Sequence, residues 1–269
     1  LLSSGLRQMT GRRFRLYFAS WVGSGPKAGV MGFISGFLSQ SMSALSFIVG
    51  SLVGAGMIPA RRGMLMIFWA NAGAGIMILI AVLDIKVLVL FLLGLAGVSF
   101  AFKRPHHLEN LAQTLFGGAM LFYGLIMLRA GAEPLATMAW FQGILIRGQS
   151  SYLLSFLAGV LLTALCQSST AVSILAIALT QVGLFSMEQT MMIIYGTNVG
   201  SSAVSWLLST TIKGTTKQLI MSQVFFNFAA AAAFVPLFFL EVLSGVPLVK
   251  ALVQSFGVPL AQQAALVYL

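Results

Sequence analysis

Long apolar segments separated by short polar runs dominate the chain. A helix needs about 20 apolar residues to cross the hydrocarbon core of a bilayer. The pattern therefore predicts an all-α membrane protein, with apolar segments at 28–58, 64–82, 85–102, 110–128, 152–184, 190–208, 218–240 and 247–269 and a shorter one within 129–151. Residues 1–27 are basic and amphipathic, which is typical of a helix at the membrane interface.

Two of these segments are broken by uncharged polar residues. The sequence QSMS at 40–43 interrupts the first segment, and QSST at 167–170 interrupts 152–184. Non-helical backbone at membrane depth is tolerated only where protein or a water-filled cavity surrounds it. We therefore expect two re-entrant helical hairpins with these residues at their tips.

An asparagine among glycines follows each hairpin. Asn71 lies in ANAGAG and Asn198 lies in GTNVGSS. This pattern predicts an interrupted transmembrane helix in which Asn198, Ser201 and Ser202 face the hairpin tip. The alternative is glycine-mediated helix packing with one interhelical hydrogen bond.

The second half of the chain repeats the first at a spacing of 127 residues, without a gap over about 40 residues. The aligned pairs include Gly32 with Gly159, Gln40 with Gln167, Ser41 with Ser168, Asn71 with Asn198 and Gly73 with Gly200. Glutamine and asparagine are rare in apolar segments, and internal symmetry of this kind is typical of secondary transporters. We predict one membrane domain, with an interfacial segment at 1–27, a first inverted repeat at 28–107 and a second inverted repeat with following spans at 108–269.

Composition excludes a soluble protein. Hydrophobic residues make up 59% of the chain and charged residues only 7%, against about 25% charged residues in soluble domains. The net charge of +10 is carried by residues between the apolar segments, so it indicates the membrane surface rather than nucleic acid as the partner. The chain starts without Met and stops inside an apolar stretch, so we expect a longer parent chain.

The distribution of basic residues predicts the orientation. If each hairpin enters and leaves on one side, eleven of the 15 lysines and arginines fall on the same side. The positive-inside rule makes that side cytoplasmic in a multi-pass protein of the plasma (inner) membrane. The first hairpin then enters from the cytoplasm and the second from outside, so the repeats are inverted.

The hairpin tips offer chemistry for two kinds of ion. The N-terminus of a returning half-helix presents free N–H groups that suit an anion. Hydroxyl, amide and carbonyl oxygens suit sodium. The alternative is that the tip serines and threonines only cap helices or join them.

No enzyme motif is present in the sequence. The five acidic residues are too few for paired-carboxylate catalysis, and there is no GxxxxGK[ST] phosphate loop and no HExxH motif. His106 and His107 read as a solvated loop pair, and Cys166 as a packing residue. We therefore expect a transporter driven by an ion gradient, without a cofactor other than the coupling ion.

The motifs resemble a known family. QSSTA, Val182–Leu184, GTNVGSS and QVFFNF at Gln223–Phe228 resemble the signature of the type II sodium–phosphate cotransporters, with the bacterial branch closest in length. The resemblance implies sodium-coupled phosphate transport. It places substrate and ion binding at Gln40, Ser41, Ser43, Asn71, Gln167, Ser168, Ser169, Thr170, Thr197, Asn198 and Ser201, with sodium ligands among Gln40, Ser43, Gln167, Ser169 and Thr170.

The first repeat departs from the family pattern. Met42 replaces a hydroxyl residue, and ANAGAG lacks the hydroxyls of the family motif. These differences leave two alternatives open: a sodium-independent anion channel on the same scaffold, and a non-transporting membrane subunit.

Overall fold

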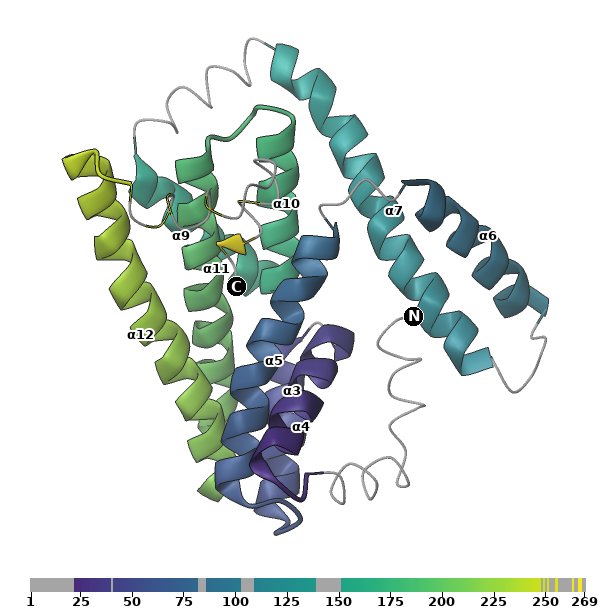
Figure 1. Ribbon diagram of the computed structural model, residues 1–269, viewed down its shortest axis with the longest axis vertical. Helices are drawn as coiled ribbons and strands as arrows, with labels where there is room; N and C mark the ends of the chain where they lie inside the picture. The colour runs from purple at the N-terminus through teal and green to yellow at the C-terminus, as the bar shows by residue number, and fades with distance from the viewer. Residues whose placement is uncertain are drawn as a thin grey trace.

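The computed structural model describes residues 22–39, 41–81, 86–102, 109–138 and 151–247, together with six single positions between 249 and 267. Every regular element within these residues is a helix (Figure 1). The all-α prediction is therefore confirmed. The proposed interfacial segment lies outside the described residues except for 22–27, as do Gln40 and both histidines.

Three consecutive helices occur twice with the same lengths. The first set is α3 (Gly25–Ser39), α4 (Met42–Gly54) and α5 (Ala60–Ala81), and the second is α9 (Tyr152–Cys166), α10 (Ser169–Gln181) and α11 (Met187–Leu208). Adding 127 to each boundary of the first set gives the boundary of the second. The spacing found in the sequence is therefore also the spacing of the helices.

Three further helices complete the described structure. Helix α12 (Gly214–Ser244) follows a short 3₁₀ turn and packs against α4 and α11, while α6 (Lys86–Phe102) packs mainly against α7 (Glu109–Thr137), away from that bundle (Figure 1). Helix α7 continues past Arg129, where two separate segments were predicted. A lone arginine does not end a helix, because arginine is itself a good helix former.

Glycines bring the backbones of paired helices into contact. A Cβ atom added at Gly32 of α3 would lie 2.2 Å from the carbonyl oxygen of Met66 in α5. One added at Gly159 of α9 would lie 2.2 Å from the carbonyl oxygen of Ile193 in α11. The spacing of 127 relates Gly32 to Gly159, and it also relates Met66 to Ile193. The repeat thus extends from the sequence to the packing of α3 on α5 and of α9 on α11.

The prediction of interrupted helices is wrong. Helices α5 and α11 run without a break through ANAGAG and GTNVGSS. Gly73 and Gly200 instead allow close packing, since a Cβ atom at either would lie 2.0 Å from Phe33 O and 2.5 Å from Val160 O respectively. The hydroxyls within α11 bond to its own carbonyls, which lets polar residues sit in a continuous helix.

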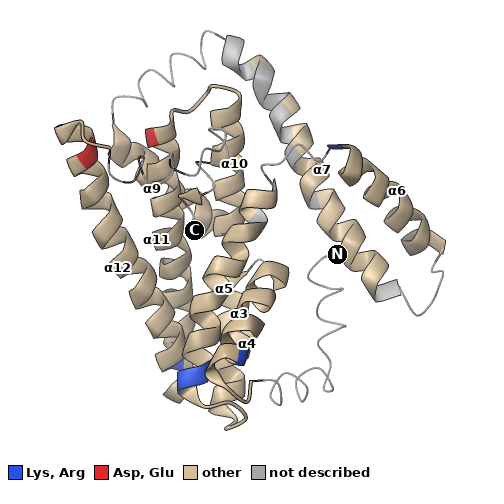
Figure 2. Ribbon diagram, in the orientation of Figure 1, with Lys and Arg blue, Asp and Glu red and all other residues tan. Residues whose placement is uncertain are grey.

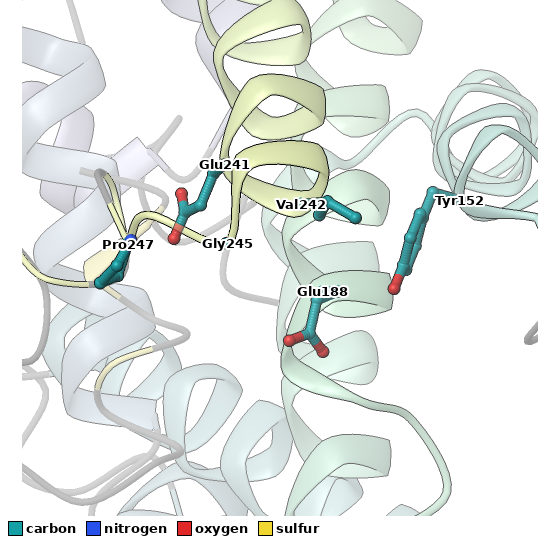
Figure 3. A pocket seen from close by; sticks show the side chains of 6 residues that line it. All are labelled: Tyr152, Glu188, Glu241, Val242, Gly245 and Pro247. Atoms are coloured by element: carbon teal, nitrogen blue, oxygen red, sulfur yellow. The ribbon is translucent and has the colours of Figure 1, made fainter.

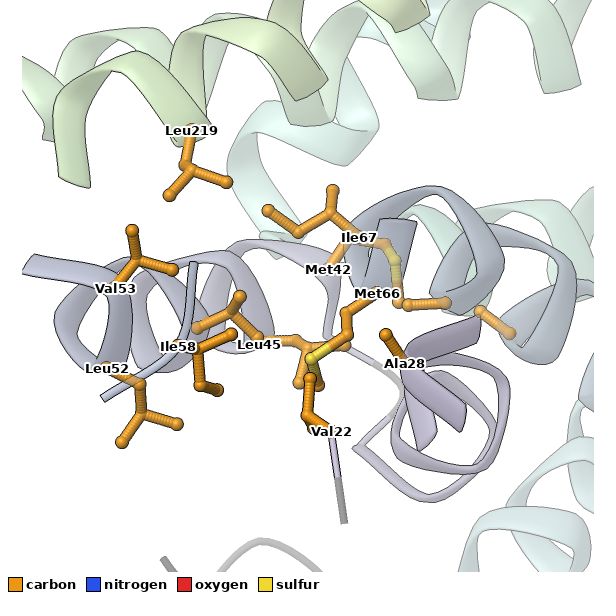
Figure 4. Packing of buried hydrophobic residues seen from close by; sticks show 13 residues of the cluster. Val22, Ala28, Met42, Leu45, Leu52, Val53, Ile58, Met66, Ile67 and Leu219 are labelled. Atoms are coloured by element: carbon orange, nitrogen blue, oxygen red, sulfur yellow. The ribbon is translucent and has the colours of Figure 1, made fainter. Parts of the chain in front are cut away.

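Each broken segment begins and ends in the same neighbourhood. Val22, just before α3, shares a buried cluster with Leu52 of α4 and with Ile58, just after α4 (Figure 4). Arg62 also donates a hydrogen bond to the carbonyl of Val22 at 2.9 Å. In the second half, Tyr152 at the start of α9 and Met187 at the start of α11 pack against one cluster.

Charges separate between the two ends of the bundle (Figure 2). Helix α12 follows Lys213 and carries Glu241 in its last turn. The charged residues of α3, α5, α11 and α12 follow the same division, with Lys27, Arg61, Arg62, Lys213 and Lys217 at one end and Glu188 and Glu241 at the other.

Two described helices are long and apolar enough to cross a membrane, by length and composition alone. They are Ala60–Ile80 and Thr215–Ser244. The helices on either side of the two breaks are shorter, at 15 and 13 residues in each half. Such lengths span about 20 Å of helix rise at most, which is less than the bilayer core.

The glycine contacts lead to a first prediction. Gly32→Ala and Gly159→Ala should each destabilise the protein by about 1–3 kcal/mol, because the backbone atoms opposite cannot move aside. Gly94→Ala in α6 is the matched control, since a Cβ atom there meets nothing within 4 Å. Thermal unfolding in detergent, followed by size-exclusion chromatography, measures the effect. An equal loss in the control would contradict the packing account.

Candidate functional site

The two breaks have the same capped geometry. Ser41 caps α4 with φ −136° and ψ 98°, and Ser168 caps α10 with φ −144° and ψ 102°. Their hydroxyl oxygens accept hydrogen bonds from Ala44 N at 3.3 Å and Ala171 N at 3.2 Å. Each cap satisfies one helix N–H, which leaves other N–H groups of the first turn to point out of the helix end. A serine hydroxyl also keeps one donor and a second acceptor lone pair for a ligand.

Gln167 has an unusual backbone conformation. It ends α9 in the left-handed region, with φ 55° and ψ 27°, and it is the one described non-glycine residue with positive φ. Its N–H donates to Thr163 O at 2.8 Å, and its side chain is exposed. Strained conformations of this kind concentrate at functional sites. The sequence identified Gln167 from its polarity, but gave no sign of the strain.

The other predicted residues of the second repeat lie between α10 and α11. Thr170 is buried near the start of α10, and Ser169 is half-buried beside it. The buried hydroxyl of Thr197 lies 3.3 Å from that of Ser173 on α10 and donates to its own helix at Ile194 O. Thr197 therefore joins α11 to α10 one turn beyond the tip.

Asn198 and Ser201 are half-buried on α11. The Ser201 hydroxyl donates to the carbonyl of Asn198 at 3.0 Å, and the Ser202 hydroxyl donates to the same carbonyl at 2.8 Å. This carbonyl oxygen is therefore a convergence point of two hydroxyls. The polar residues of GTNVGSS therefore lie on a continuous helix, where an unwound backbone was predicted.

The first repeat places its other two described candidates, Ser43 and Asn71, differently. The Ser43 hydroxyl lies 2.8 Å from the hydroxyl of Ser205 on α11, so it connects the first half to the second. The Asn71 amide donates to Ile67 O of its own helix at 3.3 Å. The Asn71 amide nitrogen therefore bonds within α5.

Four buried polar residues near these candidates were missed. Ser46 donates to Gln223 Oε1, and Asn227 Nδ2 donates to Ser202 Oγ at 2.9 Å. Ser205 bonds Ser43 as described above. Gln223 and Asn227 belong to QVFFNF, and the same signal that identified Gln167, an amide within an apolar segment, could have found both.

A pocket of about 210 Å³ lies at the acidic end of the bundle (Figure 3). Tyr152, Glu188 and Glu241 contribute its polar lining. None of the predicted binding residues lines it. Within the described residues, no three His, Cys, Asp or Glu side chains gather where they could hold a metal ion.

Comparison with known proteins decides the family. The family model described as Na+/Pi-cotransporter matches residues 1–130 and, a second time, residues 126–250. The chain belongs to the Na+/Pi-cotransporter family. This confirms the resemblance seen in the sequence, and the double match of the Na+/Pi-cotransporter model agrees with the two equal sets of helices.

A curated relative extends this comparison. The chain is 23% identical over 210 residues to the uncharacterized protein YqeW of Bacillus subtilis (strain 168), which covers 78% of this chain and 68% of the relative. No solved structure matches the chain. The Na+/Pi-cotransporter family is named for the transport of sodium and phosphate, so membership indicates a transport protein.

The strain at Gln167 leads to a second prediction. Gln167→Gly should raise the free energy of unfolding by about 1 kcal/mol, because glycine adopts positive φ without steric cost. Gln181→Gly, at an exposed helical glutamine, should lower it by up to about 1 kcal/mol. Thermal unfolding of both variants in detergent gives the comparison. Destabilisation by Gln167→Gly would show that the backbone there is relaxed.

Proposed function

We propose that the protein is a sodium-coupled secondary transporter of inorganic phosphate or a similar small anion in the plasma membrane. The observation that carries this proposal is the matched pair of capped breaks at Ser41 and Ser168 in a member of the Na+/Pi-cotransporter family. A helix N-terminus supplies N–H groups and partial positive charge to an anion. Two such termini offer a binding site without a charged side chain.

Each break forms the tip of a re-entrant hairpin in this proposal. The support is the cluster that Val22 and Ile58 share around the first hairpin and the cluster against which Tyr152 and Met187 pack around the second. The first cluster lies at the basic end and the second at the acidic end of the bundle. Hairpins that open toward opposite ends are what an inverted repeat requires.

The binding site combines the hairpin tips with the helix that follows each of them. The tip hydroxyls and N–H groups bind the anion, and neutral side-chain and carbonyl oxygens bind sodium. The residues assigned are Gln40, Ser41, Ser43 and Asn71 in the first repeat and Gln167, Ser168, Ser169, Thr170, Thr197, Asn198 and Ser201 in the second. Because these oxygens carry no formal charge, a bound anion beside them strengthens sodium binding, and sodium strengthens anion binding by the same factor.

The first repeat is the weaker contributor. The Asn71 amide is bonded to its own helix, and the buried hydroxyl of Thr197 has Ala70 as its counterpart. This difference also favours the second candidate function, a passive anion channel on the same scaffold. The two functions differ in whether anion flux depends on sodium.

A transport assay gives the third prediction. In proteoliposomes with a sodium gradient, Gln167→Ala and Ser168→Ala should each lower phosphate uptake at least about tenfold, because each removes a direct ligand. Ser41→Ala should retain more activity, since the first repeat contributes less. Gln181→Ala, at the far end of α10, is the control and should match the wild type.

Two other results of this assay would redirect the proposal. Phosphate flux that is equal with and without sodium indicates the channel. Uptake at the wild-type rate by Gln167→Ala, at equal protein per vesicle, would show that this side chain is not part of the binding site and only ends the helix.

The fourth prediction concerns the orientation in the membrane, in which the basic end of the bundle faces the cytoplasm. In a Cys166→Ala background, Ser244→Cys at the acidic end should react with an impermeant thiol reagent in intact cells. Lys213→Cys at the basic end should react only after the membrane is opened. If only Lys213→Cys is labelled in intact cells, the orientation is the opposite of the predicted one.

A further inference from the structure

Polar side chains of three helices meet along one line in the bundle. Helix α4 contributes two serines, α11 contributes two serines and α12 contributes two amides. We call this set the polar seam; its members are Ser43, Ser46, Ser202, Ser205, Gln223 and Asn227. Five of them are buried and Ser43 is half-buried.

Three hydrogen bonds between helices hold the seam together. Ser43 bonds Ser205 at 2.8 Å, and Ser46 donates to Gln223. Asn227 donates to Ser202 at 2.9 Å. Gln223 and Asn227 are four residues apart, so both amides lie on one face of α12. The seam therefore joins the returning arm of the first hairpin to two helices of the second half.

Four of the six seam residues have no polar counterpart at the spacing of 127. The spacing of 127 relates Ser202 and Ser205 to Gly75 and Ile78, and it relates Gln223 and Asn227 to Ala96 and Phe100. None of these four counterparts has a side-chain polar group. The amides of Gln223 and Asn227 are therefore not copies of a packing motif that both halves share. Buried polar groups in a membrane interior are costly, so they mark positions with a role.

Both ends of the seam connect to residues of the proposed transport site. Ser43 lies two residues after Ser41, which caps the first tip. Ser202 accepts from Asn227 and donates its own proton to the carbonyl of Asn198 at 2.8 Å. Asn227 thus sets the direction in which the Ser202 hydroxyl points. Gln223 fixes Ser46 and, through α4, the position of the capped tip.

We propose that Gln223 and Asn227 are positioning residues of the transport site, which hold the first hairpin tip and the Asn198 carbonyl in register. This inference rests on the proposed function. Neither amide touches the transported anion; each acts through a serine. Partners that orient a metal ligand from behind change ion affinity about 10–100-fold when they are lost.

The test compares the sodium dependence of variants of the full chain. Gln223→Met and Asn227→Leu remove the hydrogen bonds with similar side-chain volume. Gln218→Met, at an exposed position of the same helix, is the matched control. Two quantities are measured: the sodium concentration that half-saturates phosphate uptake in proteoliposomes, and the one that half-saturates thermal stabilisation in detergent.

We expect the half-saturating sodium concentration to rise about tenfold in Gln223→Met and Asn227→Leu, in both measurements, with the maximal uptake rate nearly unchanged. Ser46→Ala should reproduce the effect of Gln223→Met. The double variant Ser46→Ala/Gln223→Met should be no worse than either of its single variants, because both substitutions remove the same hydrogen bond. If Gln223→Met does not fold, Ser46→Ala tests the same contact with a smaller change.

The outcomes separate the inference from the function on which it rests. Unchanged sodium dependence in Gln223→Met and Ser46→Ala, or additive effects in the double variant, overturns the inference while transport stands. A wild-type protein that sodium neither drives nor stabilises overturns both. Sodium stabilisation that shifts in the variants without any phosphate uptake supports the inference and replaces phosphate by another anion.

Discussion

Contact between helix backbones at a few glycines determines where the two capped breaks lie. Lipid provides no hydrophobic force between helices, so close van der Waals packing of small residues has to hold α3 on α5 and α9 on α11. At Gly159 the carbonyl of Ile193 occupies the space of a Cβ atom. Backbone atoms cannot rotate away as side chains do. The break that follows each packed helix therefore starts from a fixed position, and so do the capped serines.

Much of this arrangement could be predicted from the sequence, because its signals are local or periodic. The spacing of 127 and the two polar breaks follow from the order of residues alone, and capping by Ser41 and Ser168 follows from the preference of serine for helix starts. The interrupted helices were predicted wrongly. Glycines beside Asn198 suit unwinding and close packing equally. The choice depends on Val160, which approaches from another helix and leaves no trace in the local sequence.

The polar seam could not be predicted for a related reason. Ser46 and Gln223 are 177 residues apart, and Gln223 has only Ala96 as its counterpart at the spacing that organises the rest of the chain. The amide in an apolar segment indicates that a partner exists, but its identity depends on how α12 lies across α4. The left-handed backbone of Gln167 was hidden in the same way, since glutamine has no special preference for that conformation.

The one-sided seam also bears on how the two halves are related. Helix α6 corresponds to the start of α12 at the spacing of 127, but it carries Ala96 and Phe100 in place of the two amides and packs mainly against α7. The present halves are therefore no longer interchangeable modules. Helix α4 of the first half is anchored by α12, a helix whose counterpart in the first half does not return to the bundle.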